Sequence, residues 1–132
     1  RILRIVPLEN SYSGETLHLN TNSDVYFSNV TISPFSTSES TTLFLGTQSG
    51  RLFKVENAQG SPYVSEISGN NFPIGNISSI SIGSSEDNIL VTFSNYGIQS
   101  VFYSSDSGQN WIDKEFEKDL ANWQIKILNT LK

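Results

Sequence analysis

The sequence predicts an all-β fold built from a repeated, four-stranded antiparallel unit. Short apolar runs recur along the chain and are separated by turn residues, with no long stretch of unambiguous helical periodicity. A long-period repeat superimposes one group of four runs on the next. Charged residues make up only 16% of the chain, and serine, threonine and asparagine are abundant, as in short-stranded β proteins.

Composition limits the class of protein. The 132 residues suit one domain, and the absence of cysteine excludes a disulfide framework and a thiolate metal site. The net charge is −5, and the eight basic residues form no stripe, so we expect no nucleic-acid partner. No apolar run approaches the ~18 residues of a membrane span, and no signal peptide is found. Because the chain begins with Arg1 and lacks methionine, we expect a processed product or a piece excised from a longer protein.

The expected strands follow one another from end to end, each bounded by small or polar turn residues such as Gln-Ser-Gly, Asn-Tyr-Gly and Asp-Ser-Gly. They are residues 2–8, 16–19, 25–32, 42–45, 52–55, 63–67, 77–82, 89–93, 101–103 and 111–116.

The repeat lays residues 42–45 on 88–91 and residues 51–55 on 100–104, so that Asn57 falls on Asp106. Each unit holds four strands in about 45–50 residues, which is typical of a β-propeller blade. The sequence therefore predicts two complete blades with partial ones, a fragment of a larger propeller, and a β-sandwich is the alternative. The expected division is 1–27 as a partial or preceding blade, 28–70 as a blade, 71–119 as a blade, and 120–132 as the next blade's start or a terminal segment.

Residues 120–131 fit two patterns. Trp123, Ile125 and Ile127 alternate as in a strand, whereas Leu120, Trp123, Ile127 and Leu131 would line one face of a helix. The repeat favours the strand.

One motif, Ser104-x-Asp106-x-Gly108-x-x-Trp111, lies between the last two strands of the second unit. Gly108 supplies a residue that tolerates positive φ, and Asp106 can accept backbone N–H groups in an Asx-type turn. Ser104 can join that network, and Trp111 can cover the turn with a large ring. The pattern favours a structural turn over a reactive site.

This motif resembles the Asp-box of bacterial neuraminidase (BNR) repeats, Ser-x-Asp-x-Gly-x-Thr-Trp, with Asn110 in place of the usual threonine. Residues 55–60 are a degenerate copy that lacks the serine and the tryptophan. Residues 28–119 are thus similar to two successive blades of neuraminidase-like, sortilin-like and xyloglucanase-like propellers. The resemblance implies the fold and says little about activity.

The up-and-down topology predicts where a ligand would bind. The Asp-box turn should share one end of the blades with loops 36–40 and 84–88, and the opposite end should carry 48–50, 94–99 and the crossover 68–76. In the resembling families ligands bind at that second end. The residues there that could stack on or hydrogen-bond a sugar, or be ordinary loop residues, are Arg51, Asn70, Asn71, Phe72, Tyr96 and Gln99.

Two functions are compatible with these features. The sequence favours a non-catalytic scaffold or adhesion segment of a larger secreted or cell-surface protein, with extracellular or periplasmic placement and with other blades, a second copy, a glycan or a protein as partner. The alternative is part of a glycoside hydrolase whose catalytic acids lie outside this chain.

Enzyme activity, metal binding and a cofactor are not expected. A neuraminidase-like site needs three arginines, and this chain has only Arg1, Arg4 and Arg51, two of them at the terminus. A xyloglucanase-like site needs two facing acids, and the nearest candidates, Glu66 and Asp113, lie in outer strands. A single histidine, His18, excludes a histidine metal cluster.

Overall fold

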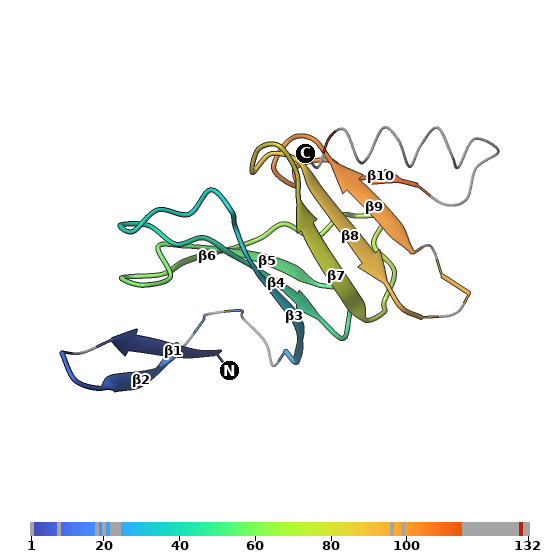
Figure 1. Cartoon of the computed structure of the whole chain (residues 1–132). Coiled ribbons are helices and arrows are strands. Elements are labelled where there is room, and N and C mark those ends of the chain that lie inside the picture. Colours follow the sequence, from blue (N-terminus) through green and yellow to red (C-terminus); the bar gives the residue numbers. More distant parts are fainter. Residues whose placement is uncertain are drawn as a thin grey trace.

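The structure is a computed structural model that describes residues 2–7, 9–17, 19, 21, 25–95, 97–98, 100–114 and 130. In these residues ten strands form three antiparallel sheets (Figure 1). The strands are β1 (Ile2–Pro7), β2 (Tyr12–Leu17), β3 (Phe27–Ile32), β4 (Leu43–Thr47), β5 (Leu52–Glu56), β6 (Tyr63–Glu66), β7 (Ile77–Ile82), β8 (Ile89–Phe93), β9 (Val101–Ser104) and β10 (Ile112–Asp113). No helix in this described part is long and apolar enough to cross a membrane.

Two of the sheets have four strands each. Sheet I has the order β3-β4-β5-β6 and sheet II the order β7-β8-β9-β10, so each strand pairs with its neighbour in the chain. Strands β1 and β2 form a separate hairpin. The prediction of an all-β fold with two four-stranded antiparallel units is confirmed. Neither sheet closes on itself, and the described residues form no ring.

The second expected strand, residues 16–19, is wrong. Strand β2 begins at Tyr12, because the chain turns directly after Pro7 and pairs Pro7 with Tyr12 and Ile2 with Leu17. The last expected strand, 111–116, is shorter in the structure, where β10 covers Ile112–Asp113 and the described residues end at Lys114 before resuming at Thr130. The question of strand or helix in 120–131 therefore falls almost wholly outside the described residues.

Sheets I and II share one register. In both, the first strand has an irregularity at the same position, between Phe27 and Asn29 and between Ile77 and Ser79. Backbone hydrogen bonds also recur in pairs at matching positions. These pairs are Ser33 N–Thr42 O with Gly83 N–Asn88 O, Thr47 N–Arg51 O with Phe93 N–Ser100 O, Gln48 N–Tyr26 O with Ser94 N–Asn76 O, and Ala58 N–Thr41 O with Ser107 N–Asp87 O. The residues that occupy matching positions in the two sheets are therefore those that the sequence repeat aligns.

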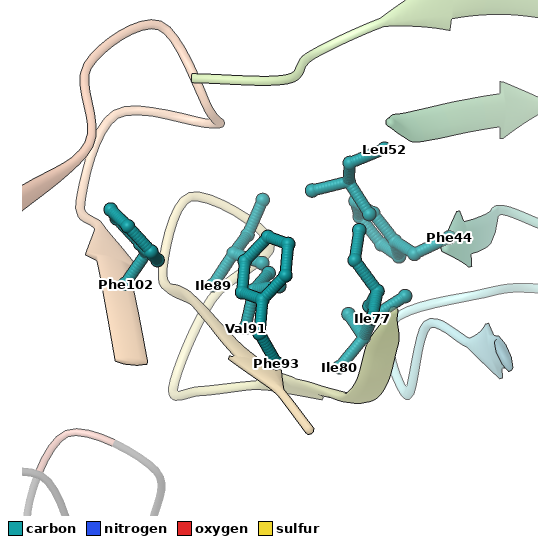
Figure 2. Close-up of a cluster of buried hydrophobic side chains, with 8 residues drawn as sticks. All are labelled: Phe44, Leu52, Ile77, Ile80, Ile89, Val91, Phe93 and Phe102. Carbon is teal, nitrogen blue, oxygen red and sulfur yellow. The ribbon is translucent and has the colours of Figure 1, made fainter. Parts of the chain in front are cut away.

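The two sheets stack on a shared apolar core. Eight buried side chains form it, drawn in Figure 2: Phe44, Leu52, Ile77, Ile80, Ile89, Val91, Phe93 and Phe102. Glycine at position 46 allows β4 to approach β7, since a Cβ there would lie 2.5 Å from Ile77 Cγ2. The core thus depends on a close contact between the backbone of sheet I and a side chain of sheet II.

Polar side chains join the first strands of the two sheets. Ser28 Oγ donates to Ile77 O at 2.7 Å, and Thr31 Oγ1 donates to Ile80 O at 3.1 Å. Asn29 Nδ2 donates to Ser78 O at 3.3 Å. Each donor precedes its acceptor by 49 residues, so β3 and β7 lie side by side in parallel. A second buried cluster, on another part of sheet I, contains Leu43, Leu45, Phe53, Val55 and Ala58.

Candidate functional site

The turn of residues 104–111, which we call the Asp-box turn after the motif that it resembles, is organised around a buried serine hydroxyl. Ser104 is 1% exposed, and its Oγ donates to Asp106 Oδ1 at 2.8 Å. The same oxygen accepts from Gly108 N at 2.9 Å and from Asp106 N at 3.3 Å. One hydroxyl therefore satisfies two backbone N–H groups of the turn that would otherwise lose their partners.

Asp106 binds the far side of the turn through Asn110. Its Oδ1 accepts from Asn110 N at 2.9 Å, and its Oδ2 accepts from Asn110 Nδ2 at 2.8 Å. The Asn110 side chain, followed by the Asn110 N–H and the Ser104 hydroxyl, lowers the pKa of Asp106 from its ordinary value. Asparagine at position 110, where the Asp-box usually has threonine, thus supplies two of the bonds to this carboxylate.

Gly108 and Trp111 attach the turn to the connection that follows β6. Gly108 has φ +85°, and a Cβ at this position would lie 3.0 Å from Ile67 Cβ, so a larger residue would be strained on both counts. Trp111 Nε1 donates to Ile67 O at 2.9 Å and to Gly108 O at 3.1 Å. The contact with Ile67 ties a turn of sheet II to the end of sheet I.

The corresponding turn of sheet I is held by a different set of bonds. Asn57 has φ +54° and donates from Nδ2 to Ser61 O at 3.2 Å, and Gly60 N donates to Asn57 O at 3.0 Å. Val55 stands at the position of Ser104, and by the strand register Val64 stands at that of Trp111. This turn therefore has neither the central hydroxyl nor the covering ring.

A shallow pocket of ≈ 190 Å³ lies between the Asp-box turn and the start of the connection to sheet II. Its lining residues are Ser68, Gly69, Asn70, Asn71, Gln109, Asn110 and Trp111. Four of these seven residues have amide side chains, each a neutral donor and acceptor of hydrogen bonds. Asn71 Nδ2 donates to Trp111 O at 3.3 Å and so bridges the two walls.

This arrangement corrects the expected position of the crossover, residues 68–76. Its first residues lie against the Asp-box turn, and its last ones contact the other end, where Asn76 Nδ2 donates to Ser94 Oγ at 3.0 Å. The physical reason is that the crossover connects the outer strand β6 with the inner strand β7 and passes along sheet II on the way.

Of the six candidate ligand residues, the four that the structure describes are therefore not brought together. Asn70 and Asn71 line the pocket, whereas the Phe72 ring packs into the core with centroids 4.9 Å from those of Phe102 and Trp111. Tyr96 and Gln99 lie outside the described residues.

Arg51 is occupied by an ion pair and does not line the pocket. Its Nε donates to Glu66 Oε1 at 3.0 Å and its Nη2 to Glu66 Oε2 at 2.8 Å, a bidentate geometry. The Arg51 hydrogen bond is the largest cause of the lowered pKa of Glu66, and Ser68 Oγ adds a further bond at 3.0 Å. Arg51 Nη2 also donates to Thr21 O at 3.2 Å.

Sequence reasoning missed Gln109 and Asn110 as pocket residues. Gln109 occupies an unspecified position of the Asp-box pattern and Asn110 the position of its usual threonine, and both are exposed and lie beside Trp111. The available signal was two adjacent amide side chains next to a tryptophan. In the described part of the chain, no group of three His, Cys, Asp or Glu residues is placed to hold a metal ion.

Comparison with known proteins returned no match among family models, curated proteins or solved structures.

Proposed function

We propose that this chain contributes two non-catalytic blades to the β-propeller of a larger secreted or cell-surface protein and binds neutral carbohydrate in the pocket beside the Asp-box turn. The observation that carries the proposal is the set of four amide side chains around Trp111, held by a fully bonded turn. Amide donors and acceptors match the alternating hydroxyl groups of a sugar, and an indole supplies apolar surface.

The rigidity of the pocket supports this assignment. Trp111 is anchored by two hydrogen bonds from Nε1, and the wall at Asn71 is bonded to the Trp111 carbonyl. A preformed site loses little conformational entropy when it binds, which matters for a shallow pocket with few contacts.

The state of the nearby acids favours binding over hydrolysis. A glycosidase acid is kept protonated by a raised pKa, whereas the pKa values of Asp106 and Glu66 are both lowered. Each carboxylate is also bonded to neighbouring side chains, Asp106 to Ser104 and Asn110, and Glu66 to Arg51 and Ser68. These two acids suit structural bonds, so a hydrolase would need other residues as its catalytic acids.

Binding to an array of neutral oligosaccharides tests the pocket. Asn70→Ala and Gln109→Ala remove exposed amides of the lining, and Gln48→Ala makes the same kind of change in an exposed turn of sheet I. We expect the two pocket variants to lose binding at an unchanged melting temperature and Gln48→Ala to bind like the parent chain. Equal binding by all four proteins, or no glycan bound by the parent chain, would contradict the proposed site.

Assays with fluorogenic sialosides and β-glucans test the absence of catalysis. We expect no turnover above the buffer rate. Turnover that is abolished by changing one acid, such as Glu66→Gln, would instead support the hydrolase alternative.

A further inference from the structure

The first strand of sheet I has apolar side chains without a covering layer. Val30 is 58% exposed and Ile32 is 63% exposed, and Tyr26, just before the strand, is 75% exposed. We call the surface of Val30 and Ile32, with the backbone between Phe27 and Ile32, the β3 surface.

The equivalent surface of sheet II is covered by sheet I. By the shared register, Val30 and Ile32 correspond to Ile80 and Ile82 of β7. Ile80 is only 5% exposed, and Ile82 packs against the shared core. The difference arises because β3 lies beside β7, whereas no described strand lies beside β3 in the same way.

Strand β7 has hydrogen-bonding side chains like those with which β3 contacts β7, so a strand of this kind could lie beside β3. The donors from β3 to β7 are Ser28, Asn29 and Thr31, and the equivalent residues of β7 are Ser78, Ser79 and Ser81. All three are hydroxyl side chains, and Ser78 and Ser79 are exposed. The acceptors they would meet on β3 are the carbonyl groups of Phe27, Ser28 and Val30, equivalent to those of Ile77, Ser78 and Ile80.

We propose that β7 of one copy of this chain docks in parallel on the β3 surface of a second copy, repeating the internal contact between β3 and β7. The two surfaces differ, so the contact is head to tail, and each added copy leaves one surface of each kind free. This inference concerns the 132 residues by themselves, without further blades of a larger protein. It depends on the internal contact alone and is independent of carbohydrate binding.

One residue limits the strength of this contact. Thr92 of β8 stands where β4 has Gly46, so β8 cannot approach a second copy as closely as β4 approaches β7. The contact is therefore confined to the two first strands and buries a small area. We expect association that is weak and rises with concentration.

Sedimentation equilibrium of the full chain over a concentration series tests the proposal with two blocking variants. Ile32→Asp places a charge on the β3 surface, and Ser79→Arg places a large charged side chain on the donor side of β7. We expect the parent chain to form dimers and longer species and each variant alone to remain monomeric. A mixture of the two should form dimers and nothing larger, because each partner retains one of the two surfaces. Ile112→Asp, at an exposed isoleucine of β10, is the control and should associate like the parent chain.

Other results would overturn the head-to-tail contact. A parent chain that stays monomeric would show that the β3 surface is not covered by a second copy. Association lost in Ile32→Asp, kept in Ser79→Arg and not restored by mixing would indicate that β3 surfaces pair with each other. Amide NMR shifts of the parent chain give a measurement that needs no variant. We expect concentration-dependent changes at both β3 and β7, and changes at only one of them would contradict the proposal.

Discussion

Sheets I and II differ most where their third strand turns into their fourth. The turn of sheet I contains Asn57 and has a valine, Val55, in place of the central serine, and it leads into β6, which has four residues, Tyr63–Glu66. The turn of sheet II contains the Asp-box network and leads into β10, which has only two, Ile112–Asp113. A strand with two paired residues is held by few backbone hydrogen bonds to its neighbour. The comparison therefore indicates that side-chain hydrogen bonds of the turn hold β10 in place of the longer backbone pairing that holds β6.

A second difference lies in the second strands. Sheet I has Gly46 and sheet II has Thr92 at the equivalent position. Gly46 faces Ile77 of the neighbouring sheet, whereas in the described part of the chain no second sheet is packed against β8 at Thr92. The residue at this position is thus small where another sheet packs closely and larger where none does.

Removing the indole of Trp111 should have the largest effect on stability. Trp111→Ala deletes the ring that packs against Phe72 and two hydrogen bonds from Nε1, and we expect a loss of about 3 kcal/mol in the free energy of unfolding. Tyr63→Ala is the control in sheet I, because Tyr63 is 66% exposed on the outer strand, and it should cost less than about 0.5 kcal/mol. Urea titrations compare the two, and equal losses would remove the distinction between the turns.

A methyl group at position 46 should separate the two sheets. Gly46→Ala places a Cβ 2.5 Å from Ile77 Cγ2, and we expect overpacking to cost about 2 kcal/mol. The matched change Thr92→Ala removes atoms from the equivalent position of sheet II and should cost less. Denaturant unfolding of both variants measures the difference. A neutral Gly46→Ala would contradict the close contact between β4 and β7.

Loss of the Ser104 hydroxyl should leave backbone groups of the turn unsatisfied. Ser104→Ala removes the acceptor for the N–H groups of Asp106 and Gly108 in a buried position, and we expect a cost of about 1–2 kcal/mol. The adjacent Ser105 is exposed, so Ser105→Ala is the control and should be nearly neutral. If both serine variants melt at the same temperature, the hydroxyl is not central to the turn.

Acidification should weaken sheet II through Asp106. Hydrogen bonds from Asn110 and Ser104 lower the folded-state pKa of Asp106 below its ordinary value of 3.8. Its contribution to stability is therefore complete well above pH 3.8 and is lost as the pH falls through the lowered pKa. Melting curves of the parent chain and Asp106→Asn should converge as the pH drops through this range. A constant difference in melting temperature across the acid range would show that the charge of Asp106 does not matter.

Part of this architecture could be predicted from the sequence. Alternating apolar residues and the long repeat identified the four strands of each sheet and their equivalence, because burial on the sheet faces fixes both periodicity and register. The start of β2 at Tyr12 was missed, since the polar run Tyr12–Glu15 has no apolar alternation. In that hairpin, the backbone pairing with β1 determines where β2 begins.

The pocket could not be predicted because it depends on how the crossover runs. Topology gives only the ends that a connection joins, β6 and β7, and leaves its path open. That path brings Asn70 and Asn71 to Gln109 and Asn110, some forty residues later in the chain, through the hydrogen bond from Trp111 Nε1 to Ile67 O. Only the packed structure shows that contact.

Hydrogen exchange at the ends of the two outer strands tests most directly whether the Asp-box turn holds β10 to sheet II. Lys114 N donates to Val101 O at 2.8 Å in sheet II, and Ile67 N donates to Leu52 O at 2.8 Å at the matching place in sheet I. In Asp106→Ala we expect the Lys114 amide to lose protection while the Ile67 amide keeps it. Unchanged protection at Lys114, or equal loss at both amides, would contradict the account.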